Sequence, residues 1–439
     1  MSLQSLRTGV SGLLANQTRL DVISNNISNS STVAFKEGRA AFSEVLGQEI
    51  LGRSSTKVGR GVSVASVDRN FSQGSLDQTG IKTDLALNGD GFFIASPEKG
   101  AGSQQRRLTR AGDFTFNQNG ELVTNGGLNV KGWTVNDQGK AQTGQLKNIQ
   151  LDPNAQSSAK FSSKATIGGN LAAEATDGTK TSISTVVYDE QGTAHDVVVE
   201  FTKDVDNGTP NNPSDDNPDR WDFTIKSADG EAFQDGGNPS NDVRAEGTIT
   251  FNTDGSVDQI STTEGSTYSA QPPGGSAEGV KLTWKNNLVS GGKGMKLSMQ
   301  NITQYSGSTT AKFQSQNGHT SGELAGFSFT KEGKLQLNYT NGEQEQTYQL
   351  AIGNVNNPNG LEQQGDNFYT TTSASGDLQL GRAGRDLQTS VVSGSLESSN
   401  VDLAQEFADL IQAQRSYQAS ARVVTTADQV LQETVQLKR

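Results

Sequence analysis

The sequence contains no cysteine among its 439 residues and only two histidines. Without cysteine, the chain can form neither disulfide bonds nor a reactive thiolate. Both histidines, His195 and His319, stand in polar turn or strand contexts, and the sequence has no HExxH, G-x-S-x-G or GxxxxGK[ST] motif. We therefore expect a protein that is not an enzyme, with no catalytic residues, no metal site and no cofactor.

Basic charge and long apolar runs are also scarce. The chain has 36 basic against 48 acidic residues, and its net charge of −12 repels phosphate backbones and anionic lipid. No stretch approaches the roughly 20 apolar residues that cross a bilayer. The opening "MSLQSLRTGVSGLL" lacks the cationic and apolar regions of a cleaved signal peptide. We expect no nucleic-acid partner, no membrane insertion and no cleaved signal.

Hydrophobic residues make up only 31% of the chain, which argues against one large compact core. The 50 glycines instead favour short strands joined by tight turns. Four segments place a polar turn with glycine before an alternating strand: "FTFNQNGELV", "VNDQGKAQ", "ITFNTDGSVDQI" and "FTKEGKLQLNY". The clearest hairpin is "VVYDEQGTAHDVVVEF", in which Val197, Val199 and Phe201 share one face. The middle of the chain is predicted to be rich in β-structure.

Both ends carry the apolar spacing of a coiled-coil seam. The N-terminal seam is Leu3, Leu6, Val10, Leu13, Leu20 and Ile27, and the C-terminal seam is Leu403, Phe407, Leu410, Tyr417, Ala421, Val424, Leu431 and Val435. Gly9 and Gly12 leave room for another backbone, while Asn400 is a candidate N-cap with Asp402 in the first helical turn.

Charged side chains are rare on both helices, although a surface helix normally keeps a charged face toward water. The two helices are therefore expected to cover each other and to be covered further by other copies of the chain. An intramolecular helix hairpin at the edge of a globular domain is the simpler alternative.

If the two ends meet, the intervening chain must run outward and return, so its domains are nested. The predicted fold class is α+β, mostly β, with nested β domains and terminal α-helices that pair as a coiled coil. The expected parts are an inner helical core of residues 1–28 and 397–439, a linker at 29–70, a discontinuous middle β domain of 71–150 and 310–396, and an outer inserted β domain at 151–309.

Two further stretches resemble ligand sites, but each is better interpreted as a turn or loop without a ligand. "LNGDGFF" lacks GxGxxG spacing, and a tight turn before a buried strand at Phe92, Phe93 and Ile94 explains it better. The acidic stretch "DVDNGTPNNPSDDNPDR" predicts a surface loop. Calcium binding through Asp204, Asp206 and Asp215 is disfavoured, because Thr209 stands where an EF-hand loop needs glycine.

Several ordered segments resemble the markers of a known family. They are "SGLLANQTRLDVISNNISN" followed by "FK", "TDLALNGDGFFI", "LTRAGDFTFNQNGELV" with "VKGW", and "NPNGLEQQGDNFY" with "GSLESSNVDLAQEFADLIQAQRSYQASARVV". Together they are similar to the bacterial flagellar rod-and-hook axial proteins, most closely to the hook members. The residues that match the markers are Asn25, Asn26, Phe35, Lys36, Gly89, Gly91, Phe92, Phe93 and Asn400. The chain departs from the family at Ala34, where glycine is common.

The resemblance implies a structural subunit that polymerises into the flagellar hook, a flexible curved tube that transmits torque from rod to filament as a universal joint. It implies a homopolymer whose other partners are a hook cap protein, the distal rod and hook–filament junction proteins. It also implies an extracellular location, reached by type III export without a cleaved signal peptide.

Two alternatives stay open. A distal rod protein would share the terminal markers, but such proteins are typically shorter and lack an insertion like residues 151–309. A secreted β-rich binding protein belongs to a different class and offers no reason for two uncharged terminal helices.

Overall fold

The computed structural model describes residues 2–45, 59–97, 106–136, 138–204, 217–227, 232–233, 243–262 and 280–436, without the side chains of residues 2, 3, 243 and 244. The chain forms two compact units. The first contains residues 1–153, 325–338 and 344–439, and the second contains 154–324 and 339–343. The second unit is thus inserted into the sequence of the first.

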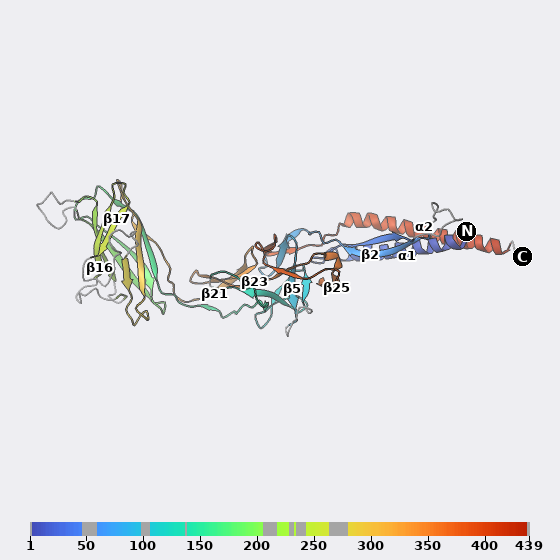
Figure 1. The fold of residues 1–439 in the computed structure, drawn as a ribbon, viewed down its shortest axis with the longest axis horizontal. Helices are drawn as coiled ribbons and strands as arrows, with labels where there is room; N and C mark the ends of the chain where they lie inside the picture. The colour runs from blue at the N-terminus through green and yellow to red at the C-terminus, as the bar shows by residue number, and fades with distance from the viewer. Residues whose placement is uncertain are drawn as a thin grey trace. The chain divides into compact units, whose positions relative to one another are not determined.

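The two helices of the first unit are α1 (Ser2–Ser28) and α2 (Leu403–Gln436), and they pack side by side (Figure 1). Strands β1 (Gly38–Glu44) and β2 (Val62–Arg69) form an antiparallel ribbon that also contacts α1. The segment expected to be a linker therefore contains regular structure. Backbone pairing from Gly38 with Arg69 to Glu44 with Val62 holds this ribbon together.

The rest of the first unit is β-structure. Its strands are β3 (Leu76–Gln78), β4 (Leu85–Asn88), β5 (Phe92–Ser96), β6 (Arg107–Thr109), β7 (Thr115–Phe116), β8 (Leu122–Val123), β9 (Asn129–Thr134), β10 (Lys147–Asn148), most of β21 (Gly322–Phe329) and of β22 (Lys334–Tyr339), β23 (Gln344–Leu350), β24 (Ile352–Asn354), β25 (Glu362–Gly365), β26 (Phe368–Thr370), β27 (Gln379–Gly381), β28 (Ser390–Ser393) and β29 (Ser395–Glu397), with a 3₁₀ turn at Pro358–Gly360.

The main sheet joins strands from both sides of the insertion. Within the first unit its order is β21-β22-β23-β9-β5-β6-β26-β25, and β4 pairs with β28 and β3 with β29 outside it. The predicted strand at Phe92, Phe93 and Ile94 is confirmed, because β5 is buried along its whole length. Phe92 and Ile94 share a core with Trp133 and Tyr369.

The second unit is a sandwich of two sheets. Its strands are β11 (Gln156–Ser157), β12 (Lys164–Ala172), β13 (Lys180–Tyr188), β14 (Ala194–Lys203), β15 (Arg220–Ser227), β16 (Val243–Phe251), β17 (Val257–Thr262), β18 (Val280–Thr283), β19 (Gly294–Tyr305) and β20 (Lys312–Gln316). Five form an antiparallel meander, β13 to β17, and four form the sheet β18-β19-β12-β20. One core contains Phe201 and Trp221 from the meander with Ile167 and Leu297 from the other sheet, so the two sheets pack face to face.

The predicted hairpins agree closely with the structure. β13 and β14 pair in register, and Val197, Val199 and Phe201 are fully buried on one face. The glycine of each predicted turn has a positive φ: Gly120, Gly139, Gly192, Gly255 and Gly333. Glycine is the residue that adopts this conformation without steric cost.

The boundary of the second unit differs from the expected 151–309. Residues 310–324 belong to it, because β20 pairs with β12 and Gly322–Glu323 of β21 pair with β11. These pairings connect residues more than a hundred positions apart, which no local pattern in the sequence reveals.

Candidate functional site

The contact between α1 and α2 is built around small side chains. A Cβ added at Gly9 would lie 3.0 Å from Val424 Cγ2, and one at Gly12 would lie 3.2 Å from Ser420 Oγ. Ala413, farther along α2, is fully buried. The two glycines therefore let the helices approach closely, as their positions in the sequence predict.

Toward the β-structure, the same helix contact becomes polar. Arg19 and Asp409 form an ion pair with an N–O distance of 2.7 Å. The buried amide of Asn26 donates to Gly38 O at 2.8 Å and to Glu406 Oε1 at 3.0 Å, and its own oxygen accepts from Gly38 N at 2.9 Å. One family-marker asparagine thus joins α1 to both α2 and the β1–β2 ribbon. Asn25, next to it, is exposed.

The contacts from α1 to α2 involve residues next to the predicted α1 seam. Gly9, Gly12, Arg19 and Asn26 of α1 have neighbours or partners on α2, and each stands one residue before a predicted seam position. Of the predicted residues, Val10 is exposed and Leu6, Leu13, Leu20 and Ile27 are half-buried, while the side chain of Leu3 lies outside the described residues. Close approach of the two helices is possible where side chains are small, as at Gly9 and Gly12.

On α2 the predicted seam residues differ in their burial. Val424 contacts the Gly9 region, and Leu410, Tyr417, Ala421 and Leu431 are half-buried, whereas Leu403, Phe407 and Val435 are exposed. Exposed Leu403, Phe407 and Ile411 follow at four-residue spacing, with 43%, 52% and 51% of each side chain accessible. We call these three residues the α2 stripe. Residues four apart lie on one helix face, so the stripe is a continuous apolar surface.

The β1–β2 ribbon covers a second side of α1. A Cβ on Gly61 would lie 2.1 Å from Ser11 Oγ, and one on Gly38 would lie 3.4 Å from Val22 Cγ1. Even so, Leu14 on α1 and Phe42 and Val67 on the ribbon are exposed. Within the described part of one chain, α2 and the ribbon leave an apolar side of the helices uncovered.

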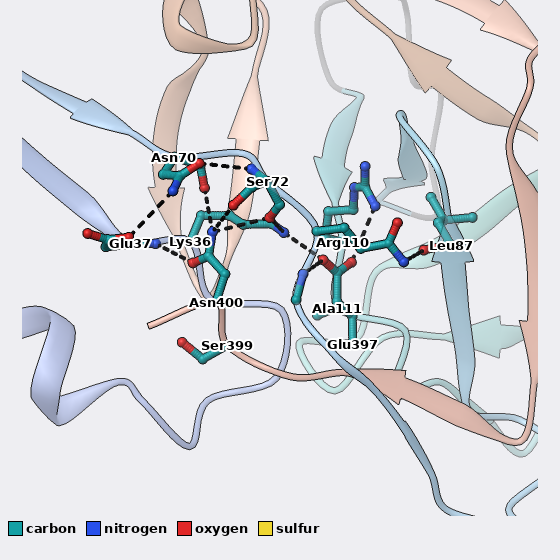
Figure 2. A network of polar contacts seen from close by, with 12 residues as sticks. Lys36, Glu37, Asn70, Ser72, Leu87, Arg110, Ala111, Glu397, Ser399 and Asn400 are labelled. Atoms are coloured by element: carbon teal, nitrogen blue, oxygen red, sulfur yellow. Dashed lines mark hydrogen bonds and ion pairs between the residues drawn. The ribbon is translucent and has the colours of Figure 1, made fainter. Parts of the chain in front are cut away.

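A buried ionic cluster ties the segment after α1 to β29 and to the segment after β6 (Figure 2). Lys36 Nζ lies 2.6 Å from Glu397 Oε1, and Arg110 contacts Glu397 Oε2 at 3.3 Å. Lys36 also donates to Ser72 O at 2.7 Å, and Gly74 N donates to Glu397 Oε1 at 2.9 Å. Burial lowers the pKa of Lys36 and of Arg110 despite the neighbouring carboxylate. One carboxylate therefore neutralises part of two buried positive charges.

The remaining family-marker residues surround this cluster. Arg110 donates to Gly89 O at 2.8 Å, and its guanidinium lies 5.6 Å from the Phe92 ring centroid. A Cβ on Gly91 would meet Ile352 at 2.7 Å, and Phe93, which follows Phe92, is fully buried. These contacts place the start of β5 beside Arg110.

Phe35 is also buried, with the Arg69 guanidinium 5.2 Å from its ring centroid. Ala34 adopts φ 54°, and its N–H donates to Glu397 O at 2.7 Å. Glycine, common here in the family, would hold this conformation without the roughly 1 kcal/mol cost that alanine carries.

The predicted N-cap is wrong, because Asp402 rather than Asn400 caps α2. Asp402 Oδ1 accepts from Ala404 N at 2.9 Å and from Gln405 N at 3.2 Å. Asn400 instead accepts from Glu37 N at 2.8 Å and donates to Asn70 O at 2.8 Å (Figure 2). It therefore joins the start of α2 to the segments before β1 and after β2.

Several residues of this site were not predicted, among them Arg110, Glu397, Glu406, the Arg19–Asp409 pair, and Asp402 in its capping role. A lone charged residue carries no spacing signal, and only folding brings its partner near. Asp402 was recognisable in principle, because it directly precedes the first residue of α2.

We expect acidification to stabilise the helix pair through Glu406. Burial, with the charges of Glu37 and Asp409, raises the pKa of Glu406, while the Asn26 hydrogen bond opposes this. Because the pKa of Glu406 is higher in the folded than in the unfolded state, its protonation stabilises the fold. This stabilisation is fully present at a pH below the unfolded-state pKa and is lost as the pH rises through the folded-state pKa. Glu406→Gln should therefore raise the free energy of unfolding of the helix pair at pH 7 by about 1 kcal/mol. It should also make that free energy depend less on pH.

Circular dichroism at the helical minimum measures this effect, since α1 and α2 are the two α-helices of the described chain. The matched control is Glu433→Gln, an exposed carboxylate on the same helix. Equal pH profiles for wild type and Glu406→Gln would contradict the prediction.

Of the three aspartates considered for calcium binding, only Asp204 lies within the described residues. Asp204 pairs with Arg220 at 3.2 Å, and Asp206 and Asp215 lie outside the described residues. Among the described residues, no group of three His, Asp or Glu side chains is placed to hold a metal ion. Neither helix of the described chain has the length and hydropathy needed to span a bilayer.

Comparison with known proteins assigns the helical ends to one class. The family model "Flagella basal body rod protein" matches residues 6–36, and "Flagellar basal body rod FlgEFG protein C-terminal" matches 392–437. The β regions match "Flagellar hook protein FlgE/F/G D1 domain" at 86–167 and "Flagellar basal body protein FlaE D2 domain" at 154–319. The paired terminal helices and nested β units are thus those of a flagellar rod-and-hook axial protein.

Full-length relatives define the family more narrowly. The chain is 32% identical to the flagellar hook protein FlgE of Salmonella typhimurium, over 99% of this chain and 100% of the relative. It is 30% identical to FlgE of Escherichia coli, over 98% of each. The crystal structure of Helicobacter pylori flagellar hook protein FlgE2 aligns with 73% of this chain and 100% of that one, at TM-score 0.49 and 13% identity. On the full-length identities, the chain belongs to the flagellar hook protein FlgE family.

Proposed function

We propose that this chain is the structural subunit that polymerises into a flagellar hook, a flexible curved tube that works as a universal joint between rod and filament. The observation that carries the proposal is the uncovered apolar side of the terminal helices, centred on the α2 stripe. In a tube, neighbouring copies would bury this surface, together with exposed seam residues such as Val10 and Val435.

The two units suit different parts of such a tube. The helices of residues 1–28 and 397–439 would form the inner core, and the middle β domain would surround it. The second unit would form the outer layer, where polar contacts exchange at low cost as the tube bends. Other partners would be the hook cap protein during growth, the distal rod, and the hook–filament junction proteins.

The proposed location is extracellular, in the hook of the flagellum, after export without a cleaved signal peptide. A chain with no cysteine suits this route, because it cannot become cross-linked by disulfides before or after export.

Electron microscopy of the purified full-length chain after salt-induced assembly tests the proposal. Curved tubes with a rough outer layer are the expected result. Straight tubes would favour a rod-type shaft instead, and failure to polymerise at any salt concentration would refute self-assembly.

A further inference from the structure

Three polar side chains form an ordered row on the β8–β10 part of the first unit. Lys131 of β9 and Asn148 of β10 are directly opposite each other in the antiparallel pair. Lys131 Nζ donates to Asn148 Oδ1, and Asn148 Nδ2 donates to Glu121 Oε1 at 2.7 Å. The row therefore runs from an amine, through a side-chain amide, to a carboxylate.

Pairing of the strands places all three groups on one face. Directly opposite residues of an antiparallel pair project to the same side. Glu121 forms a bridge with Gln150, which lies two positions after Asn148 and so shares its face. Asn117 Nδ2 donates to the other carboxylate oxygen of Glu121 at 3.1 Å and orients it further.

The environment of the lysine is unusual for a charged group. Lys131 is buried, although it lies on the face opposite to the fully buried side chains of Val130 and Ile149. Across the described residues, no carboxylate lies within ion-pair distance of its amine. Burial lowers the pKa of Lys131, although Glu121 partly offsets this. A larger fraction of the amine is thus neutral and nucleophilic than on a surface lysine.

We propose that Lys131 and Asn148 become joined by an intramolecular isopeptide bond, formed by the folded chain itself with Glu121 as the proton carrier. This modification goes beyond the hook-subunit function proposed above and does not depend on it.

The reaction that forms this bond is balanced and needs no added reactant. Neutral Lys131 Nζ attacks Asn148 Cγ, a new Nζ–Cγ bond forms, and the Cγ–Nδ2 bond breaks. In the tetrahedral intermediate Nζ and Nδ2 are bonded to the same Cγ, which brings Nζ next to the Glu121 carboxylate that already accepts from Nδ2. Glu121 takes the proton from Nζ and passes it to Nδ2, which leaves as ammonia. Glu121 returns to its starting state. Fixed strand pairing supplies the proximity that makes such a reaction feasible at an otherwise unreactive amide.

The product would tie β9 to β10 covalently and close the chain between residues 132 and 147 into a loop. A closed loop reduces the entropy of the unfolded state, as a disulfide does in a chain that has cysteine. Such a bond would resist separation of the two strands under mechanical load.

Intact mass of the denatured full-length protein tests the bond. Wild type should be lighter than Glu121→Gln by one ammonia molecule, after correction for the substitution, because Gln cannot carry the proton. Lys131→Arg and Asn148→Ala should likewise lack the deficit. Lys147→Arg, an exposed neighbour on β10, is the control and should keep it.

Peptide mapping then locates the change. After denaturation and trypsin, residues 111–140 should appear joined to 148–160, with no cleavage after Lys131. A wild-type mass equal to that of Glu121→Gln, with normal cleavage after Lys131, would overturn the proposal. A deficit that maps to Asn119 or Asn125, each followed by glycine, would also overturn it, since succinimide formation there releases ammonia too.

Discussion

Replacing Glu397 by alanine is expected to destabilise the first unit by about 3–5 kcal/mol. The substitution removes the one carboxylate shared by Lys36 and Arg110, and both cations are buried. Truncating one partner of a buried ionic cluster is costly because the remaining charges stay desolvated without compensation. Gly74 N and Lys36 Nζ would also each lose a hydrogen-bond acceptor.

Hydrogen exchange in increasing urea measures this loss by region. Peptides from β3, β4 and β29 should exchange at lower urea than in wild type, while peptides from the second unit should be unchanged and serve as an internal reference. Glu362→Ala removes an exposed carboxylate of the same unit and should leave all regions unaffected. Matching profiles for the two variants would show that the cluster contributes little stability.

A partial rescue would identify the cause. Adding Lys36→Met to Glu397→Gln removes one buried cation along with the carboxylate, leaving Arg110 with its hydrogen bond to Gly89 O. Because the sites are in direct contact, we expect the double variant to be less destabilised than the sum of its single substitutions.

Phe407→Glu is expected to weaken polymerisation strongly while leaving the folded subunit intact. Phe407 is half-exposed at the centre of the α2 stripe, so a charge there costs the subunit little. At an interface between copies, the same charge would be desolvated and the apolar burial lost, about 2–3 kcal/mol from the side chain alone. Every subunit in a tube would carry this defect, so the concentration required for assembly should rise at least about thirtyfold.

Sedimentation of polymer after salt addition measures that concentration. The matched control is Gln412→Glu, which makes the same charge change at an exposed position on another side of α2. Helical circular dichroism should be the same for both variants. If Phe407→Glu assembles as readily as Gln412→Glu, the α2 stripe does not lie between copies.

The β turns and hairpins were predictable because their determinants are local. Gly192 and the alternating Val197, Val199 and Phe201 define a hairpin within sixteen residues, and the structure confirms it. The helices were equally visible, and Gly9 and Gly12 correctly indicated where another backbone comes close. Relatives in the FlgE family confirm the resemblance that the marker segments suggested.

At Gly9, Gly12, Arg19 and Asn26, the α1 residues that contact α2 stand one position before a predicted seam residue. Apolar spacing identified Leu6, Val10 and Leu13, but packing selected Gly9 and Gly12 because small residues permit a shorter distance between axes. Apolar spacing shows which side of a helix is apolar. It does not show whether α2 packs on that side of α1 or on the neighbouring side that carries the glycines.

By itself, the sequence determined the β-rich middle, the two terminal helices and the absence of thiol chemistry, since each follows from composition or short-range spacing. Only the tertiary structure decided that Lys36, Arg110 and Glu397 meet, that Asp402 caps α2, and that Lys131 faces Asn148 with Glu121 beyond it. Single charged and amide side chains leave no periodic pattern in the sequence. They meet their partners only when strand pairing and burial bring distant segments together.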